Sequence, residues 1–347
     1  MRWDAQSLAV DDGALPGLTR AGLVRSIQAP EFDGVTFHEV LCKSALNRVP
    51  EGSAMPFRWT VNPSRGCTHQ CKYCYARPTH EYLDFSAGAD FDREIVVKTN
   101  IVPVLRKELR RGSWRREHVA LGTNTDPYQR AEGRYRLMPG IISALAESRT
   151  PFSVLTKGTL LRRDLPLLSA VARHVDVAIG VSLAILDDDL QRSLEPGTPA
   201  PRARLGLIRA VREAGFSCGV MVAPVVPYLT DSAEHLDALL AAIADAGATS
   251  VTVLPMHLRG STRGVFLEWL SEHHPSLIRR YRVIYGRGAY VSAEYRDWLR
   301  GRVTPLVRMH GLAGNSSSGF RKVEDAADRP AGTARGSSVP EPALTLF

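Results

Sequence analysis

Three cysteines lie close together in the segment Cys67-Thr-His-Gln-Cys71-Lys-Tyr-Cys74. The spacing C-x3-C-x2-C places three thiolates on one short loop, where they can bind three corners of a cubane iron–sulfur cluster. The fourth iron then lacks a protein ligand, whereas clusters built for electron transfer usually have four cysteines. A metal with an open position accepts an exogenous ligand, as catalytic metal sites do. The motif therefore predicts a [4Fe–4S] cluster with a catalytic role.

Other uses of these cysteines stay open at this point. A zinc site would need a fourth ligand, which His69, His80 or Cys42 could supply, although the spacing is unusual for zinc. The thiolates could also hold a structural or electron-transfer cluster, or no metal. The chain has five cysteines, and an odd number argues against a disulfide scaffold and for reduced thiols that bind a metal.

The segments that must position this loop alternate between strand and helix patterns. Apolar runs predict strands at 58–61, 118–121, 152–156, 176–183, 217–223 and 250–254. Helical patterns predict helices at 101–111, 139–148, 165–174, 202–214 and 233–246. This alternation indicates parallel β/α units joined by right-handed crossovers. Six units predict an α/β fold, a partial (β/α)6 TIM-like barrel, where a full barrel has eight units.

Polar residues follow four of these strands and a proline follows a fifth, at the end where barrel enzymes carry their chemistry. The first strand leads into the cysteine loop, and the second leads into a Thr-Asn-Thr-Asp-Pro segment. The third and fourth strands end at Lys157 and Ser182, and the fifth runs into Pro224. Because these ends converge on one rim, the sequence predicts a site there.

The cysteine motif, with Tyr73 before the third cysteine, resembles the signature of the radical S-adenosylmethionine (SAM) superfamily. From about Asn62 to Pro255 the chain is also similar to the spore photoproduct lyase-like branch, whose members are often labelled DNA repair photolyases. The similar stretches are Asn62-Pro-Ser-Arg-Gly-Cys67, Gly122-Thr-Asn-Thr-Asp-Pro-Tyr128, Thr156-Lys157, Leu194-Glu-Pro196 and Pro224-Val-Val-Pro227. The resemblance implies that SAM binds the open iron. Reductive cleavage then gives methionine and a 5′-deoxyadenosyl radical, which abstracts hydrogen from a substrate.

The resemblance implies roles for individual residues. The cluster ligands, and so the catalytic residues, are Cys67, Cys71 and Cys74. The cofactor-binding residues are the Tyr73 backbone near the adenine, Thr125 and Asp126 near the methionyl end, and Lys157 and Ser182 at the SAM carboxylate or ribose.

The residues by themselves allow simpler roles as well. Asp126 precedes a proline and could cap a turn, Lys157 could lie on the surface, and Ser182 could be a satisfied core hydroxyl. Glu195 could be a helix-start acid, with Arg204 as its partner or as an exposed helix residue.

One position departs from the branch. True spore photoproduct lyase has a hydrogen-donating cysteine just before Ser-Asp at the end of the second strand, and Asn124 stands there in this chain. An amide cannot give up a hydrogen atom as a thiol does, and the remaining cysteines are Cys42 and Cys218. Reversal of a thymine dimer by the same route is therefore not expected.

The substrate and partners stay open on the sequence alone. The enzyme could act, in a lyase-like reaction, on a nucleic-acid lesion, or it could modify a small molecule or a protein. The electron would come from a reductant protein such as flavodoxin or ferredoxin. The alternative from another class is a non-catalytic iron–sulfur or zinc module that binds nucleic acid.

The formal net charge is +8, and much of the excess is local. Six cations lie within eleven residues: Arg106, Lys107, Arg110, Arg111, Arg115 and Arg116. They form either a solvated helix face or a patch that contacts phosphates. Their position decides between these, because a patch on the cluster-bearing rim favours nucleic acid and a patch behind the barrel does not.

The ends of the chain differ from its middle. Residues 1–55 have mixed polarity and no long period, so we expect an irregular N-terminal extension before a core domain at 56–312. Residues 313–347 are rich in Gly, Ser, Pro and Ala, which predicts a disordered tail. No apolar run approaches the ~20 residues of a membrane span. The start has no secretory pattern, so we expect a cytoplasmic protein without a membrane partner.

Overall fold

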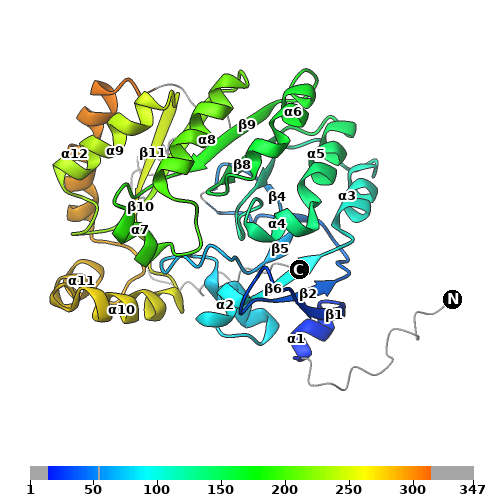
Figure 1. Cartoon of the computed structure of the whole chain (residues 1–347), viewed down its shortest axis with the longest axis horizontal. Helices are drawn as coiled ribbons and strands as arrows, with labels where there is room; N and C mark the ends of the chain where they lie inside the picture. Colours follow the sequence, from blue (N-terminus) through cyan, green and yellow to red (C-terminus); the bar gives the residue numbers. More distant parts are fainter. Residues whose placement is uncertain (1–14, 54, 314–347) are drawn as a thin grey trace, which may run out of the picture.

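Six parallel strands form the centre of the computed structural model, which describes residues 15–53 and 55–313 (Figure 1). They are β4 (Trp59–Val61), β7 (Val119–Leu121), β8 (Phe152–Thr156), β9 (Val177–Ser182), β10 (Cys218–Val225) and β11 (Ser250–Pro255). The sheet order is β11-β10-β9-β8-β7-β4, with β3 (Leu46–Arg48) antiparallel at the edge. Because each strand lies beside its neighbour in sequence, every crossover steps the same way and the sheet curls. This confirms the predicted partial (β/α)6 barrel.

Helices cover the outside of this curved sheet. Figure 1 shows them as an arc: α3 (Ile101–Leu109), α5 (Leu137–Glu147), α6 (Leu161–Val171), α8 (Pro201–Glu213) and α9 (Ala233–Asp245). Each turns an apolar stripe inward, as Met138, Ile141 and Leu145 do in α5. The helix predicted at 165–174 begins earlier, at Leu161, because Pro166 is accommodated inside it. The predicted boundary there is wrong by about one turn.

Shorter helices connect these units, and three longer ones follow the last strand. The connecting elements are α4 (Arg130–Tyr135), α7 (Asp188–Leu194), the 3-10 helix η2 (Arg77–Leu83) and α2 (Ala89–Arg93). After β11 come α10 (Thr262–His273), the 3-10 turn η3 (Pro275–Leu277), α11 (Ile278–Tyr285) and α12 (Ala293–Met309). None of the described helices is long and apolar enough to cross a membrane.

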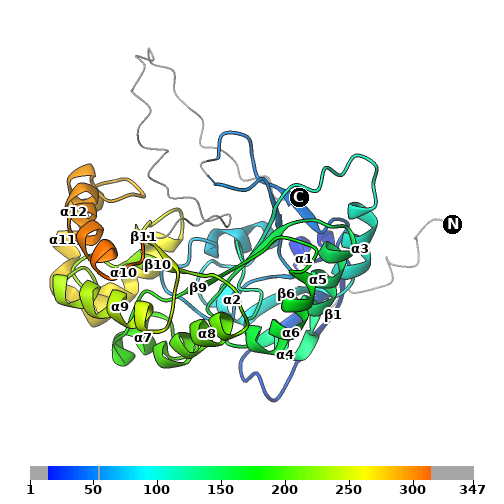
Figure 2. The ribbon, with the colours of Figure 1, turned by 90° about the horizontal axis from the view of Figure 1, so that it is seen from above.

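The segment expected to be irregular instead forms part of a second sheet. Helix α1 (Pro16–Arg20) leads into β1 (Leu23–Gln28) and β2 (Thr36–Val40). These strands join β6 (Glu94–Lys98) and β5 (Ser64–Arg65) in the order β1-β2-β6-β5. Strand β2 runs parallel to β6, which is far away in sequence. No local sequence pattern could therefore predict this pairing. Figure 2 shows this sheet at the opposite end of the molecule from α10 to α12.

The predicted tail lies almost wholly outside the described residues. Its first residue, Ala313, forms an isolated antiparallel bridge with Ser250, the first residue of β11. Residues 314–347 are not described, and neither are residues 1–14 and 54.

Candidate functional site

The cysteine loop leaves β5 at the carboxyl end of the barrel strand β4. Cys67 and Cys71 are buried, Cys74 is half-buried, and all three are free thiols. Gly66 starts the loop with φ +79°, and an added Cβ would lie 2.9 Å from the His80 ring and 3.0 Å from the carbonyl oxygen of Phe91. Only glycine fits this turn, because both its backbone angle and its surroundings exclude a side chain.

A second segment, Leu194-Glu-Pro-Gly197, holds the cysteine loop from the other side of the barrel. The amide of Lys72 donates to the carbonyl of Leu194 at 2.9 Å, and the amide of Gly197 donates to the carbonyl of His69 at 3.1 Å. A Cβ on Gly197 would lie 1.9 Å from the carbonyl oxygen of Thr68. The Leu-Glu-Pro-Gly segment therefore fixes the loop through close backbone contact.

Glu195 in this segment is fully buried and surrounded by cations. Its Oε2 lies 2.7 Å from Arg204, its Oε1 lies 3.9 Å from the Lys157 ammonium, and the Tyr73 hydroxyl also donates to it. Burial raises the pKa of Glu195, but Arg204 and Lys157 outweigh it and the pKa is lowered. Arg204 has 0% exposed surface, so it is the partner of Glu195 and not an exposed helix residue.

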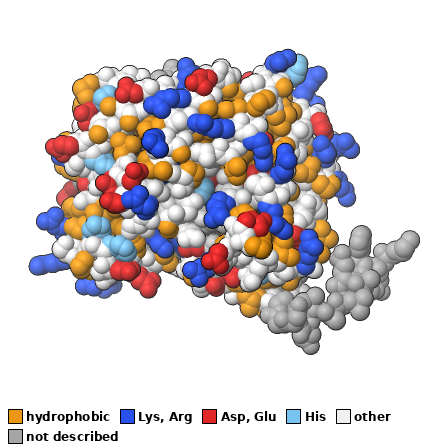
Figure 3. Space-filling view, in the orientation of Figure 1, with side chains coloured by type: hydrophobic (Ala, Val, Ile, Leu, Met, Phe, Trp, Pro, Cys, Tyr) orange, Lys and Arg blue, Asp and Glu red, His pale blue; other side chains and the backbone are white. Residues whose placement is uncertain are grey.

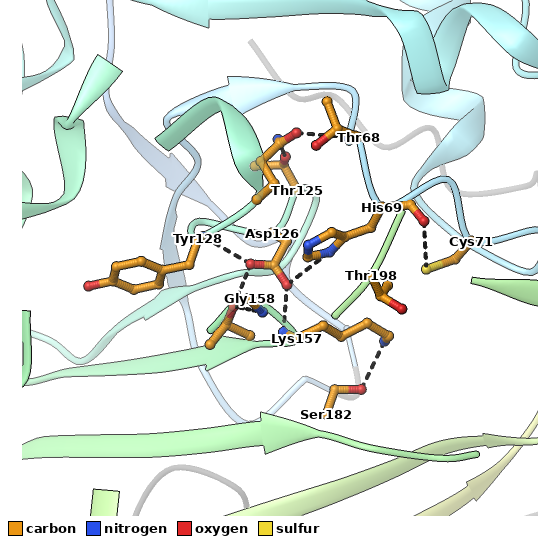
Figure 4. Close-up of polar contacts among 12 residues, drawn as sticks. Thr68, His69, Cys71, Thr125, Asp126, Tyr128, Lys157, Gly158, Ser182 and Thr198 are labelled. Atoms are coloured by element: carbon orange, nitrogen blue, oxygen red, sulfur yellow. Dashed lines mark hydrogen bonds and ion pairs between the residues drawn. The ribbon is translucent and has the colours of Figure 1, made fainter. Parts of the chain in front are cut away.

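Lys157 and Ser182 meet at the ends of neighbouring strands. The Lys157 ammonium donates to Ser182 Oγ at 2.9 Å and lies 5.8 Å from the centre of the Tyr73 ring. Figure 4 shows the lysine chain extending toward Ser182. An ammonium has three donors, so after the bond to Ser182 it keeps donors for a bound carboxylate.

Asp126 is the hub of the contacts in Figure 4. Its Oδ1 accepts from the Tyr128 amide at 2.9 Å and from the Thr156 hydroxyl, and its Oδ2 accepts from the Lys157 amide at 2.7 Å. His69 Nδ1 lies 3.4 Å from Oδ2. Burial raises the pKa of Asp126, but His69 and these donors outweigh burial. The net effect is a lowered pKa, so the carboxylate is ionised. It ties two strand ends to the cysteine loop.

Thr125 joins a second polar cluster, whose members no sequence pattern predicts. Its hydroxyl donates to the carbonyl of Gly66 at 2.8 Å and accepts from Gln129 Nε2 at 2.8 Å. Gln129 is buried, and its Oε1 accepts from the Thr68 amide at 2.8 Å. Only the proximity of Gln129 to Thr125-Asp126 in sequence could have suggested that Gln129 supports the cysteine loop.

The residues considered as a fourth zinc ligand have other contacts. His69 faces Asp126, with its Nδ1 3.4 Å from Oδ2. Burial lowers the pKa of His69, but the charges of Cys67 and Asp126 raise it more, so that the pKa rises to about 10. His80 bonds through Nε2 to the carbonyl of Glu94 at 2.8 Å.

Two of the three thiols lie where burial disfavours a free thiolate. Burial raises the pKa of Cys71 well above its ordinary value, although Lys157 opposes this. Burial and the charge of Cys67 raise the pKa of Cys74 to about 11. Because burial penalises the bare anion, a bound cation would favour ionisation of Cys71 and Cys74.

Of the two other cysteines, Cys218 lies apart from the rim. Cys218 is the first residue of β10 and has 0% exposed surface, so it sits at the amino end of its strand, opposite the site. Cys42 is half-buried after β2, and its backbone amide bonds to Asn100 Oδ1 at 2.8 Å. Asn124 is half-buried at the rim.

The basic cluster lies behind the barrel. Its residues end α3 and fill the loop before β7, at the amino end of that strand. In this loop Trp114 packs edge-on against Trp59, the first residue of β4, with ring centres 5.3 Å apart. Figure 3 shows Lys and Arg side chains spread over one face of the molecule among acidic and apolar ones. The position disfavours this cluster as a nucleic-acid contact for the site.

A sequence family described as the radical SAM superfamily matches residues 61–251. The chain belongs to this superfamily. The matched residues span the barrel from β4 to β11, including the cysteine loop. The family prediction is confirmed, and membership supports an enzyme that uses SAM.

Relatives of the chain come from organisms and viruses of very different kinds. An uncharacterized protein of Mycobacterium tuberculosis (strain ATCC 25618 / H37Rv) is 66% identical over 320 residues, which are 91% of this chain and 94% of that protein. An uncharacterized protein of Acidianus two-tailed virus is 28% identical over 60% of this chain and 70% of its own length.

Among solved structures, the fold is similar to that of spore photoproduct lyase. One variant of that enzyme aligns with a TM-score of 0.60 at 15% identity, over 80% of this chain and 81% of its own. Another, with bound AdoMet and dinucleoside spore photoproduct, aligns with a TM-score of 0.59 over 79% of each chain at 15% identity. The predicted likeness to this branch is confirmed at the level of the fold.

Proposed function

We propose that Cys67, Cys71 and Cys74 hold a [4Fe–4S] cluster and that the chain is a cytoplasmic enzyme that cleaves SAM reductively. The products are methionine and a 5′-deoxyadenosyl radical, which abstracts hydrogen from a substrate. The observation that carries the proposal is the set of three free, closely spaced thiols at the carboxyl end of a radical SAM barrel.

The donor set fits such a cluster. Thiolates are the ligands that iron–sulfur clusters use, and a bound cation favours ionisation of the buried Cys71 and Cys74 thiols. When bound, a cluster with three protein ligands supplies an electron and an open iron for SAM. A flavodoxin or ferredoxin is the proposed electron donor.

The chain's own residues then hold the SAM. Lys157 pairs with the SAM carboxylate. Ser182 and Glu195 orient the Lys157 ammonium for this contact. Asp126 and Thr125 set the spacing between the strand ends and the cysteine loop at the methionyl end, and the backbone of Tyr73 borders the adenine. The buried Glu195–Arg204 pair keeps this arrangement rigid.

The substrate is proposed more broadly. A structural neighbour binds dinucleoside spore photoproduct, which makes a nucleic-acid lesion one candidate for a lyase-like reaction. Asn124 cannot donate a hydrogen atom, and Cys218 lies at the other end of its strand. The proposed reaction therefore does not return hydrogen from a thiol at either position. A small molecule or a protein is the alternative substrate.

An anaerobic reconstitution tests the proposal. The protein receives iron, sulfide, a strong reductant and SAM, and 5′-deoxyadenosine is quantified. We expect production by the wild-type chain and none by Cys71→Ala. Zinc bound without iron uptake, or a cluster that leaves SAM intact with every candidate substrate, would instead support the non-catalytic module.

Substitution of Lys157 tests the SAM contact separately. Lys157→Met removes one charge-assisted hydrogen bond, so we expect SAM to bind about 10- to 100-fold more weakly. Iron content stays at the wild-type level, because Lys157 is not a cluster ligand. Equal SAM affinity in an equilibrium titration of both proteins would contradict this role.

A further inference from the structure

Two cations line one small pocket beside the cysteine loop. Arg65 ends β5 and Lys98 ends β6, and these strands pair antiparallel with Arg65 opposite Val96. Lys98 lies two residues beyond Val96, so both side chains leave the same face as diagonal neighbours. The uncharged residues that line the pocket include Asn62, Asn124, Thr79 and Tyr82.

Neither cation has a carboxylate partner in the part of the chain that the structure describes. Glu108 acts on Lys98 only across space, because its carboxylate already accepts from the Ser44 hydroxyl at 2.8 Å and from two backbone amides at 3.0 and 2.9 Å. No Asp or Glu is among the described residues that line the pocket.

Three other arginines that are buried or half-buried are neutralised. Carboxylates lie 2.8 Å from Arg77, 2.7 Å from Arg204 and 2.6 Å from Arg163. In the Arg65–Lys98 pocket, by contrast, burial and the charge of Arg65 lower the pKa of Lys98 to about 8. Two like charges partly removed from water repel each other, and an anion between them relieves this cost.

We propose that the Arg65–Lys98 pocket binds a phosphate group of the substrate, so that the substrate is a nucleotide or a nucleic acid. The inference rests on the proposed function, because it makes this pocket the substrate side of the same site. Arg65 stands two residues before Cys67, and Asn124 stands at the rim one residue before Thr125. A phosphate held here places the attached sugar and base beside the cysteine loop.

The groups in the pocket match a phosphate ester better than a carboxylate. An arginine fork binds two oxygens of a phosphate, and a lysine adds a point charge, which together balance up to two negative charges. Tyr82 is 54% exposed at the pocket, so its ring is available to a base. Stacking of bases on aromatic rings accompanies phosphate contacts in proteins that bind single strands.

Binding to the full chain with its reconstituted cluster and SAM tests the proposal. The probes are thymidine, thymidine 5′-monophosphate and a short oligothymidylate, titrated under anaerobic conditions. We expect both phosphate esters to bind more tightly than thymidine, with inorganic phosphate as a competitor. Tighter, strongly salt-dependent binding of the oligothymidylate identifies nucleic acid as the source, and preference for the monophosphate identifies a free nucleotide.

The matched variants are Lys98→Gln, Lys98→Arg and Lys107→Gln. We expect Lys98→Gln to weaken phosphate-ester binding about 10- to 100-fold. Lys98→Arg should restore most of it, and Lys107→Gln, on the exposed end of α3, should leave it unchanged. Circular dichroism checks that each variant is folded, and the charge-preserving variant separates loss of charge from loss of structure.

Two outcomes would overturn the inference: equal affinity of the wild-type chain for thymidine and its monophosphate, or equal affinity of Lys98→Gln and wild type for the monophosphate. The wild-type protein's SAM cleavage, measured in the same preparation without any probe, reports on the proposed function by itself. Cleavage without phosphate selectivity therefore refutes the pocket alone, and a reconstituted cluster that leaves SAM intact both without and with every candidate substrate refutes the proposed enzyme.

Discussion

At the carboxyl ends of the barrel strands, Glu195 and Arg204 are fully buried and touch each other, with Lys157 close by. At the amino ends, Arg110, Arg111 and their neighbours are exposed to solvent. The amino end has the denser run of charge in the sequence, but the carboxyl end has the charges that are costly to bury. Charge taken out of water, and not charge counted along the chain, therefore marks the site.

The largest contrast is expected between two cysteines, one at each end of the barrel. Cys71→Ala removes one of three proposed ligands, so iron uptake and 5′-deoxyadenosine formation should both be lost. Cys218→Ala, in the core at the start of β10, should keep both. Iron per chain and product per hour are the measurements, and loss of iron from both variants would break the comparison.

The next contrast concerns two glutamates that pair with arginine. Glu195→Ala leaves Arg204 buried without its partner, which should lower the free energy of unfolding by about 3–5 kcal/mol. Glu147→Ala removes an exposed pair with Arg106 and should cost about 0–1 kcal/mol. Urea denaturation of both variants measures the difference. Similar losses in the free energy of unfolding would mean that burial does not decide how much these ion pairs stabilise the fold.

A smaller contrast concerns two glycines. Gly197→Ala forces its new Cβ against the carbonyl of Thr68, so the loop must shift and unfolding should become about 1–3 kcal/mol easier. Gly264 lies in α10 with nothing near its missing Cβ, so Gly264→Ala should be neutral or stabilising. Thermal melts compare the two, and an unchanged melting temperature for Gly197→Ala would refute the close approach.

The smallest effect is expected from the basic cluster. Replacing Arg110, Arg111 and Arg115 together by Gln should change SAM cleavage and phosphate-ester affinity by less than about twofold, because long-range effects of exposed charges are screened by salt. Both are measured at physiological ionic strength. A large loss of oligonucleotide binding in this variant would mean that nucleic acid contacts the basic cluster at the amino ends of the barrel strands.

The barrel could be predicted because its signals are local. The predicted strand 152–156 has the bounds of β8, and the other five strands differ from the prediction by at most two residues at either end. The apolar runs and the cysteine spacing each act within a few residues. The cofactor-binding roles implied for Thr125 and Ser182 stay predictions, although both residues lie at the rim.

The rest of the site depends on contacts between distant parts of the chain. Gln129 meets Thr68, and His69 meets Asp126, across about 60 residues of sequence. That Arg65 and Lys98 lack a carboxylate partner among the described residues is likewise not visible before the strands pair. A single sequence shows which residues are polar, but not which of them lack a partner.

The pairing of β2 with β6 has a consequence for how the chain can be shortened. A chain beginning at residue 56 would keep β6 but lose the strand that covers its edge, together with the Phe37 side chain that packs beside Ile95 and Val97. An uncovered edge with apolar side chains is a template for pairing with another molecule. The shortened protein should therefore aggregate during refolding. By covering the edge of β6, the segment before the barrel prevents self-association of the chain.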